Sequence, residues 1–149
     1  MNYSSLLYQI AGIDDQQYDN MTATELIAKQ QIQKGQYQDA TETFKFITDT
    51  LITGFTGLQS HYNLLLTNNP DDGKWMDYLN LQSTRQQIGV GNITFSDGAQ
   101  VEINLKADIT KSIKHKLSIF LDSKISVLLY NGQLDVIVAP VLTEAFLKR

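Results

Sequence analysis

The sequence predicts an α/β fold in which a helical first third precedes a helix, a strand and a second helix. The run Ile125–Tyr130 is rich in β-branched and aliphatic residues, which is typical of a strand buried on both faces of a parallel sheet. Asn131-Gly132 ends this run, because both residues accept positive φ. A helical pattern over Asp108–Leu121 comes before the strand, and Pro140 suits the first turn of a helix after it. Alternation of helix and strand indicates a parallel sheet.

Two short stretches near the N-terminus carry the start and stop patterns of helices. Ser4 or Ser5 is expected to cap a short helix that stops near Gly12. Thr22–Glu25 has the spacing of a capping box, so a second helix is expected to begin there. Gly35 is expected to end that helix, because glycine is the usual residue just beyond a helix C-terminus.

Further helices and turns are predicted through the middle of the chain. A third helix is expected from about Gln38 to Ile52, because its apolar residues recur four, three and four positions apart. These residues are Ala40, Phe44, Ile47 and Leu51. Asn68–Gly73 and Ser96–Gly98 are expected to be turns, and residues 74–88 one or two short helices. Asp108 is expected to cap the helix that leads to the strand.

Length and composition exclude several classes of function. The 149 residues are enough for one ordinary core. A net charge of -4 with no cluster of basic residues argues against nucleic acid as a partner. No apolar run approaches the length that spans a bilayer, so no membrane partner is expected, and the first residues lack the basic region of a signal peptide. The chain has no cysteine.

Asp135 is the candidate catalytic residue. It stands in the loop after the predicted strand, where open α/β sheets gather their reacting groups. The alternative is an aspartate that caps the next helix or accepts hydrogen bonds from loop amides, and the pattern alone favours that alternative.

The residues around Asp135 also resemble a segment of a known enzyme family. Tyr130–Val138 (YNGQLDVIV) resembles the segment that carries the triad aspartate in serine carboxypeptidases, especially the vitellogenic-carboxypeptidase-like branch. The resemblance implies an α/β-hydrolase fold, a peptide substrate and removal of C-terminal residues through an acyl-enzyme. It also implies that Asp135 orients the catalytic histidine, and it calls for no cofactor and no metal.

The resemblance extends over about Leu7 to Leu147. Leu7–Asp14 is similar to the start of the cap insertion, and His61–Leu65 to a Tyr-Asn-Phe/Leu stretch of the family. Residues 84–91 match the family pattern Val-Arg-x-Ala-Ile-His-Val-Gly at four positions (Arg85, Ile88, Val90, Gly91) and depart from it at three (Thr84, Gln87, Gly89). Residues 1–70 are accordingly expected to be a helical cap region and residues 71–149 part of the α/β-hydrolase core.

Two members of the triad are missing from these 149 residues. No two of the nine glycines lie four positions apart, so there is no Gly-x-Ser-x-Gly elbow. His61 and His115 both precede Asp135, whereas the catalytic histidine should follow it, and neither has a second ligand at metal-binding spacing. We expect an internal fragment of the enzyme, inactive alone and either poorly folded or prone to associate, with Met1 an internal methionine. A short non-catalytic relative that serves as a helical binding or interaction module is the alternative.

Glycosylation tripeptides occur at Asn92, Asn20 and Asn2. Asn92 is the best candidate, because relatives often carry a similar Gly-Asn-x-Thr there, and Asn20 is the second. An ordinary polar loop is the alternative for each. The resemblance places the complete enzyme outside the cell or in the lysosome, and the sequence leaves the oligomeric state open.

Overall fold

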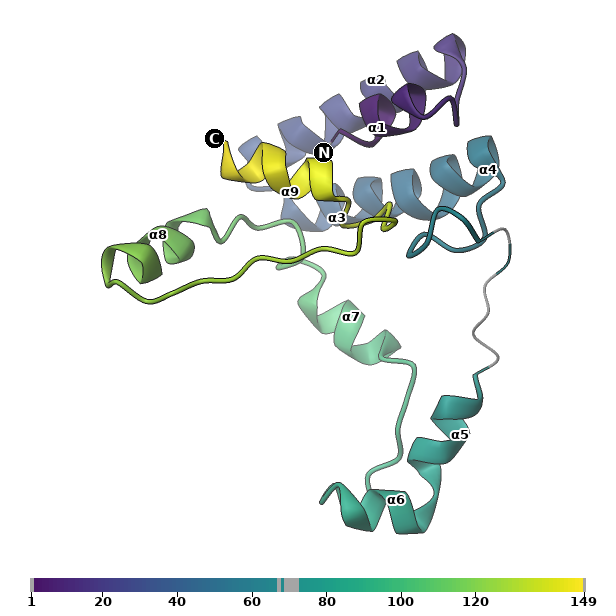
Figure 1. Cartoon of the computed structure of the whole chain (residues 1–149), viewed down its shortest axis with the longest axis vertical. Helices are drawn as coiled ribbons and strands as arrows, with labels where there is room; N and C mark the ends of the chain where they lie inside the picture. Colours follow the sequence, from purple (N-terminus) through teal and green to yellow (C-terminus); the bar gives the residue numbers. More distant parts are fainter. Residues whose placement is uncertain (1, 67, 69–72, 149) are drawn as a thin grey trace.

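The computed structural model describes residues 2–66, 68 and 73–148. Within these ranges the chain forms helices joined by turns and loops, and no strand is present in them. The elements are α1 (Tyr3–Gln9), α2 (Asp15–Gln33), α3 (Tyr37–Lys45), η1 (Phe46–Ile52), α4 (Thr53–Thr56), α5 (Lys74–Asn80), α6 (Gln82–Gln87), α7 (Ala99–Leu105), α8 (Lys114–Asp122) and α9 (Pro140–Leu147). Figure 1 shows α1 to α4 gathered with α9, while α5 and α6 lie apart from them.

α1 is tied to α2 by a serine inside the helix. Ser4 is buried, and its amide and hydroxyl donate to the two carboxylate oxygens of Glu25 at 3.1 and 3.2 Å. The expectation that Ser4 or Ser5 caps this helix is therefore wrong, because Asn2 holds the N-cap position. The helix ends near Gly12 as expected, although Ala11 (φ +55°) takes the left-handed conformation.

α2 starts earlier than its expected capping box. The Asp14 side chain accepts from the Gln17 amide at 2.8 Å, and the Gln17 side chain accepts from the Asp14 amide at 2.9 Å. This pair is a working capping box, so the start expected at Thr22 is wrong. The expected stop is confirmed, because Gly35 (φ +73°) follows the helix in the left-handed conformation.

The third helix runs further than expected. α3 continues through the wider π-helical turns of η1 into α4 without interruption, so the helical stretch ends at Thr56 rather than Ile52. Its predicted apolar face is confirmed, because Ala40, Ile47 and Leu51 are buried and Phe44 packs against the core.

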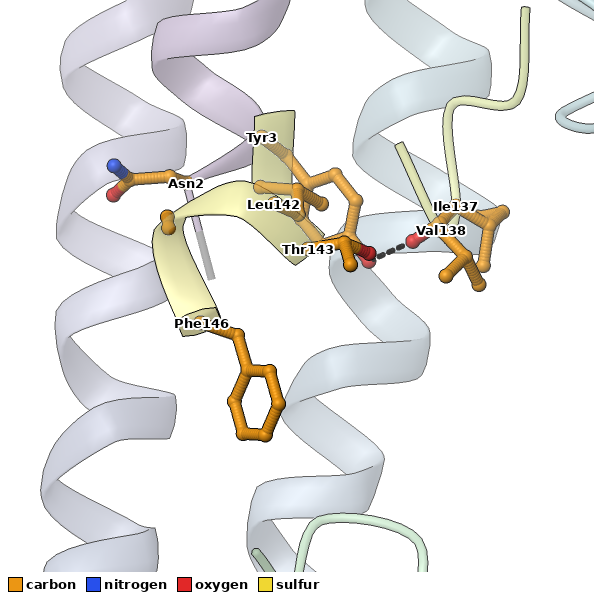
Figure 2. Close-up of a pocket in the computed structure, with 8 residues that line it drawn as sticks. Asn2, Tyr3, Ile137, Val138, Leu142, Thr143 and Phe146 are labelled. Carbon is orange, nitrogen blue, oxygen red and sulfur yellow. Dashed lines mark hydrogen bonds between the residues drawn. The ribbon is translucent and has the colours of Figure 1, made fainter. Parts of the chain in front are cut away.

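At the other end of the chain, Leu142 and Thr143 of α9 lie beside Tyr3 of α1 (Figure 2).

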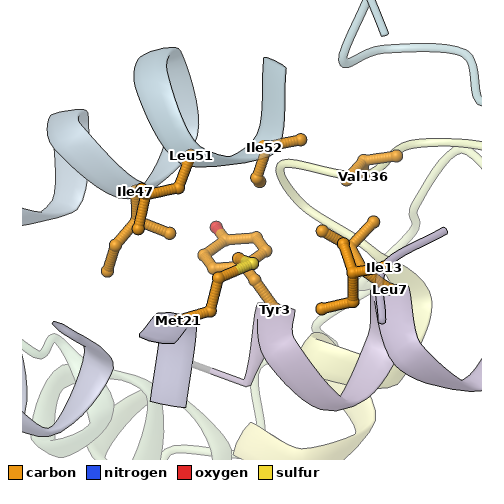
Figure 3. Packing of buried hydrophobic residues seen from close by; sticks show 8 residues of the cluster. All are labelled: Tyr3, Leu7, Ile13, Met21, Ile47, Leu51, Ile52 and Val136. Atoms are coloured by element: carbon orange, nitrogen blue, oxygen red, sulfur yellow. The ribbon is translucent and has the colours of Figure 1, made fainter. Parts of the chain in front are cut away.

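The hydrophobic core lies between α1–α2 and α3–η1. Figure 3 shows Tyr3 and Met21 facing the apolar residues of η1, with Val136 of the C-terminal loop at the edge. The buried cluster consists of Tyr3, Leu7, Ile13, Met21, Ile47, Leu51, Ile52 and Val136. One residue from beyond position 130 thus joins a core otherwise built by the first 52 residues.

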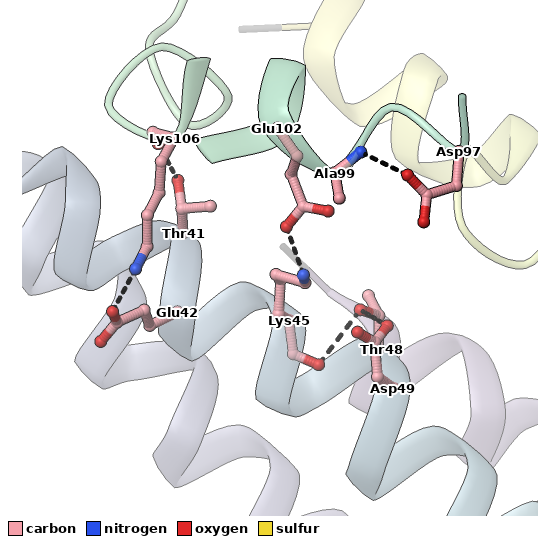
Figure 4. Close-up of polar contacts among 9 residues, drawn as sticks. All are labelled: Thr41, Glu42, Lys45, Thr48, Asp49, Asp97, Ala99, Glu102 and Lys106. Carbon is pink, nitrogen blue, oxygen red and sulfur yellow. Dashed lines mark hydrogen bonds and ion pairs between the residues drawn. The ribbon is translucent and has the colours of Figure 1, made fainter. Parts of the chain in front are cut away.

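α7 is held against α3 by polar side chains. Lys45 pairs with Glu102, and Lys106 pairs with Glu42 (Figure 4). The Thr41 hydroxyl also donates to the Lys106 carbonyl at 2.7 Å. These contacts cross from the N-terminal helices to a helix that the sequence pattern did not predict.

Asp108 does not cap the helix that was expected to begin there. Its carboxylate pairs with Lys111 at 2.8 Å within a turn, which lowers the pKa of Asp108, and α8 begins only at Lys114. The expectation of one or two short helices over residues 74–88 is confirmed, and the structure forms two, α5 and α6. Where a turn was expected at Ser96–Gly98, the structure has a bend at Gly98, and the Asp97 side chain accepts from the Ala99 amide at 3.0 Å. Residues 69–72 of the turn expected at Asn68–Gly73 lie outside the described residues.

The strand expected at Ile125–Tyr130 is not formed in this structure. The segment is irregular and exposed to solvent, with 83% of Leu128 and 87% of Tyr130 accessible. A strand needs a neighbouring strand to pair its backbone N–H and C=O groups. The described residues supply no such neighbour, so the backbone of this segment is not paired in a sheet and its apolar side chains stay exposed. Pro140 begins α9, as its position predicted.

Candidate active site

Asp135 lies half-buried in a closed loop between the irregular segment and α9. Its amide donates to the Gly132 carbonyl at 3.1 Å, and its Oδ1 accepts from the Val138 amide at 2.9 Å. Asn131 closes the loop, because its side-chain amide donates to the Val138 carbonyl at 2.8 Å. Asp135 therefore does bind a loop amide, which is the role that the pattern alone favoured.

The segment after α4 and the first residue of α1 hold this loop on both sides of Asp135. Before it, the Leu134 carbonyl accepts from the Leu64 amide at 2.9 Å. After it, the Val136 amide donates to the His61 carbonyl at 2.9 Å, and the Val136 side chain enters the core. The Tyr3 hydroxyl donates to the Ile137 carbonyl at 2.7 Å (Figure 2). Asp135 is thus placed by contacts between residues that are 70 or more positions apart in the chain.

Two apolar clefts flank the loop. One of about 240 Å³ lies beside Asp135 and is lined by Leu6 and Ile10 of α1, Leu64, and Pro140 of α9, among others. The other, of about 380 Å³, lies on the far side of Tyr3 and includes Leu142 and Phe146 of α9 (Figure 2). The loop is bordered by apolar surface that a peptide or a further protein segment could cover.

Tyr3 is the buried polar group next to this loop. Burial raises its pKa to about 12, and the negative charges of Glu25 and Asp135 act in the same direction. The phenol is therefore a neutral hydrogen-bond donor at neutral pH, where carboxylates are ionised.

The two histidines do not form a dyad with Asp135. The ring Nε2 of His61 lies 3.0 Å from the Thr53 hydroxyl, and His115 lies on the exposed surface of α8. In the described part of the chain, the Asp135 carboxylate receives its hydrogen bond from the Val138 amide and not from an imidazole. The structure thus places one candidate triad member.

The described residues contain no cluster of three histidine or acidic side chains placed to hold a metal ion. Over the same residues, none of the helices has both the length and the apolar character needed to cross a bilayer.

The two glycosylation candidates lie in different settings. Asn92 is exposed in the turn after α6, where its carbonyl accepts from Arg85 at 3.4 Å. Asn20 is exposed but lies within α2, and its neighbour Met21 is fully buried. Of these two, only Asn92 therefore has the loop setting that is usual for a glycan attachment site.

The serine carboxypeptidase family matches residues 2–149, which is nearly the whole chain. The chain belongs to the serine carboxypeptidase family. It is 37% identical over 152 residues to the probable serine carboxypeptidase CPVL of Homo sapiens and 35% identical over 150 residues to that of Rattus norvegicus. Each alignment covers 95% of this chain and 31% of the relative. The venom serine carboxypeptidase of Apis mellifera is 31% identical over 159 residues, covering all of this chain and 34% of the relative.

This serine carboxypeptidase segment thus spans about a third of the length of the curated relatives it matches. No solved structure gives a significant match. The resemblance seen in the sequence is confirmed at the level of the family, which implies an α/β-hydrolase fold. The described residues contribute helices to that fold, without its strands.

The contacts that place Asp135 were not anticipated from the sequence. Tyr3 and Ile137 are 134 positions apart, and no spacing rule links residues at such a separation. A buried tyrosine near the start of the chain has no local pattern that distinguishes it from an ordinary core residue.

Proposed function

We propose that the complete protein is a serine-type carboxypeptidase that hydrolyses the C-terminal peptide bond of its substrates, with Asp135 as the acid of the catalytic triad. The observation that carries this proposal is the family match over residues 2–149. The serine and the histidine lie in the two-thirds of the enzyme that this chain does not span. Residues 1–70 form the helical cap region and residues 71–149 belong to the hydrolase core.

The loop geometry supports a role for Asp135 beyond holding its own loop. An ionised carboxylate offers about four lone-pair sites, and the Val138 amide uses one of them on Oδ1. Acceptor capacity therefore remains for an imidazole N–H. In a serine hydrolase that bond holds the tautomer in which the other ring nitrogen faces the serine, and it stabilises the imidazolium that forms during attack.

The open segment Ile125–Tyr130 is the strand that leads to Asp135 in the complete enzyme. Its β-branched composition and the exposure of its apolar side chains support this assignment. Strand pairing there would place Asp135 at the carboxyl edge of the sheet, where α/β enzymes gather their reacting groups.

The complete enzyme is secreted or lysosomal, acts on peptides and needs no cofactor. The exposed tripeptide at Asn92 supports passage through a compartment where glycans are attached. The relative from Apis mellifera is named a venom protein.

The test is Asp135→Asn in the complete enzyme. The amide keeps the size of the carboxylate but favours the wrong histidine tautomer, so turnover should fall about 10⁴-fold, as for the same change in a chymotrypsin-type triad. Turnover on a blocked dipeptide and the melting temperature are measured together. The 149-residue chain alone should release no amino acid, because it lacks the nucleophile and the base.

The matched control is Asp97→Asn. Asp97 also accepts a hydrogen bond from a backbone amide two residues further on, that of Ala99 at the start of α7 at 3.0 Å, and it lies far from Asp135 in the chain. If the aspartate has a loop role alone, the change costs at most about 1 kcal/mol of stability, because the asparagine oxygen still accepts from the amide, and turnover is unchanged. If Asp135→Asn behaves like Asp97→Asn, the triad assignment is wrong. In that event the alternative of a non-catalytic binding module gains support.

A further inference from the structure

We infer that Tyr3 is a positioning residue for Asp135, because its hydroxyl fixes the loop that carries the proposed triad acid. The inference rests on the proposed function, and it concerns a residue in the first turn of α1 rather than one in the hydrolase core.

The Tyr3 side chain is held rigidly in the core. Its side chain is 4% exposed and belongs to the core cluster, and its ring packs 6.3 Å from that of Phe44. Its hydroxyl donates to the Ile137 carbonyl at 2.7 Å, two residues beyond Asp135 (Figure 2). Because the ring is buried in the core cluster, the hydroxyl is a fixed point against which the loop is placed.

The Tyr3 hydrogen bond fixes the part of the loop that also binds the Asp135 carboxylate. The Val136 amide binds the His61 carbonyl, so the backbone just after Asp135 is fixed. Beyond it, Val138 is exposed and its amide binds Asp135 Oδ1. The Tyr3 bond to Ile137 lies between these two points. Losing it would leave this part of the loop held only by bonds within the loop, from Asp135 and Asn131, so the Asp135 carboxylate and the amide that it accepts from would move together.

The expected consequence is specific to catalysis. A misdirected carboxylate holds the catalytic imidazole less well, and this loss is felt in the transition state, where the imidazolium forms. The turnover number should therefore fall while KM stays unchanged. A weaker bond to the carboxylate also lowers the pKa of the imidazole, so the midpoint of the kcat–pH profile should move to lower pH.

The experiment compares Tyr3→Phe with Tyr8→Phe in the complete carboxypeptidase. Both variants keep the ring and remove one hydroxyl from α1, but the Tyr8 hydroxyl donates to Asp15 at 2.7 Å and not to the loop. Tyr3→Phe should lower kcat by about 10 to 100-fold, the scale expected when a catalytic group is misplaced by up to an ångström. Tyr8→Phe should leave kcat and the pH profile unchanged.

Hydrogen exchange supplies a readout that does not depend on activity. Peptides covering residues 132–139 should exchange faster in Tyr3→Phe than in Tyr8→Phe, because the loop has lost its tether. Equal exchange and equal kcat in the two variants would overturn the inference. If Asp135→Asn turns over normally, the proposed function fails first. A large loss in Asp135→Asn without any loss in Tyr3→Phe refutes the positioning role alone.

Discussion

Met21→Ala tests whether the helices at the start of the chain share one core. Met21 lies on α2 and is fully buried between α1 and η1 in the cluster of Figure 3. Truncation to alanine removes its thioether chain and leaves a cavity walled by helices that cannot easily close it. Substitutions of this kind cost about 2–5 kcal/mol, and a value of about 3 kcal/mol fits a fully enclosed site.

The assay is urea unfolding followed by circular dichroism. With a slope of about 2 kcal/mol per molar, a loss of about 3 kcal/mol lowers the urea midpoint by about 1.5 M. Leu26→Ala is the control, because Leu26 lies on the same helix and is 53% exposed. It should change stability by no more than about 0.5 kcal/mol. Equal midpoints for the two variants would refute the packing of α2 against η1.

Two further predictions concern association and pH. The exposed apolar run around Leu128 offers unpaired backbone to a second copy, so the 149-residue chain should self-associate, and Leu128→Lys should reduce this in sedimentation velocity. Association that is unchanged in Leu128→Lys would place the contact elsewhere. Folding raises the pKa of Tyr3 from 10.0 to about 12, so the stabilisation from its neutral form is complete below pH 10 and is lost as the pH rises through about 12. Thermal melts over this range should show a decline that Tyr3→Phe reduces, and parallel curves would contradict the prediction.

Local patterns predicted the elements whose stability is local. The stop at Gly35 and the start at Pro140 depend on one residue each, and both are present in the structure. The apolar face of the third helix was also predictable, because burial follows the helical period. The start of α2 was missed for a related reason. Thr22–Glu25 and Asp14–Gln17 both fit the capping pattern, and the structure uses the earlier one.

Contacts between distant residues could not be predicted in this way. Glu25 was assigned to a cap, yet it is buried and binds Ser4 of another helix. The strand at Ile125–Tyr130 needs pairing partners, which composition cannot supply. For the site, the sequence predicted Asp135 and its two possible roles, but it contained no sign that Tyr3 and His61 hold its loop.

The tie between Tyr3 and Ile137 has a consequence for how the chain reaches its folded state. Closing a loop of 134 residues carries an entropic term of about 4 kcal/mol, whereas one hydrogen bond contributes only about 1 kcal/mol net. The tie therefore forms only together with burial of Val136 in the core. Since ribosomes deliver the N-terminal part first, α1 to α4 are made before the loop emerges. The loop that carries Asp135 therefore packs against helices that have already been synthesised, and this packing is a late step in folding.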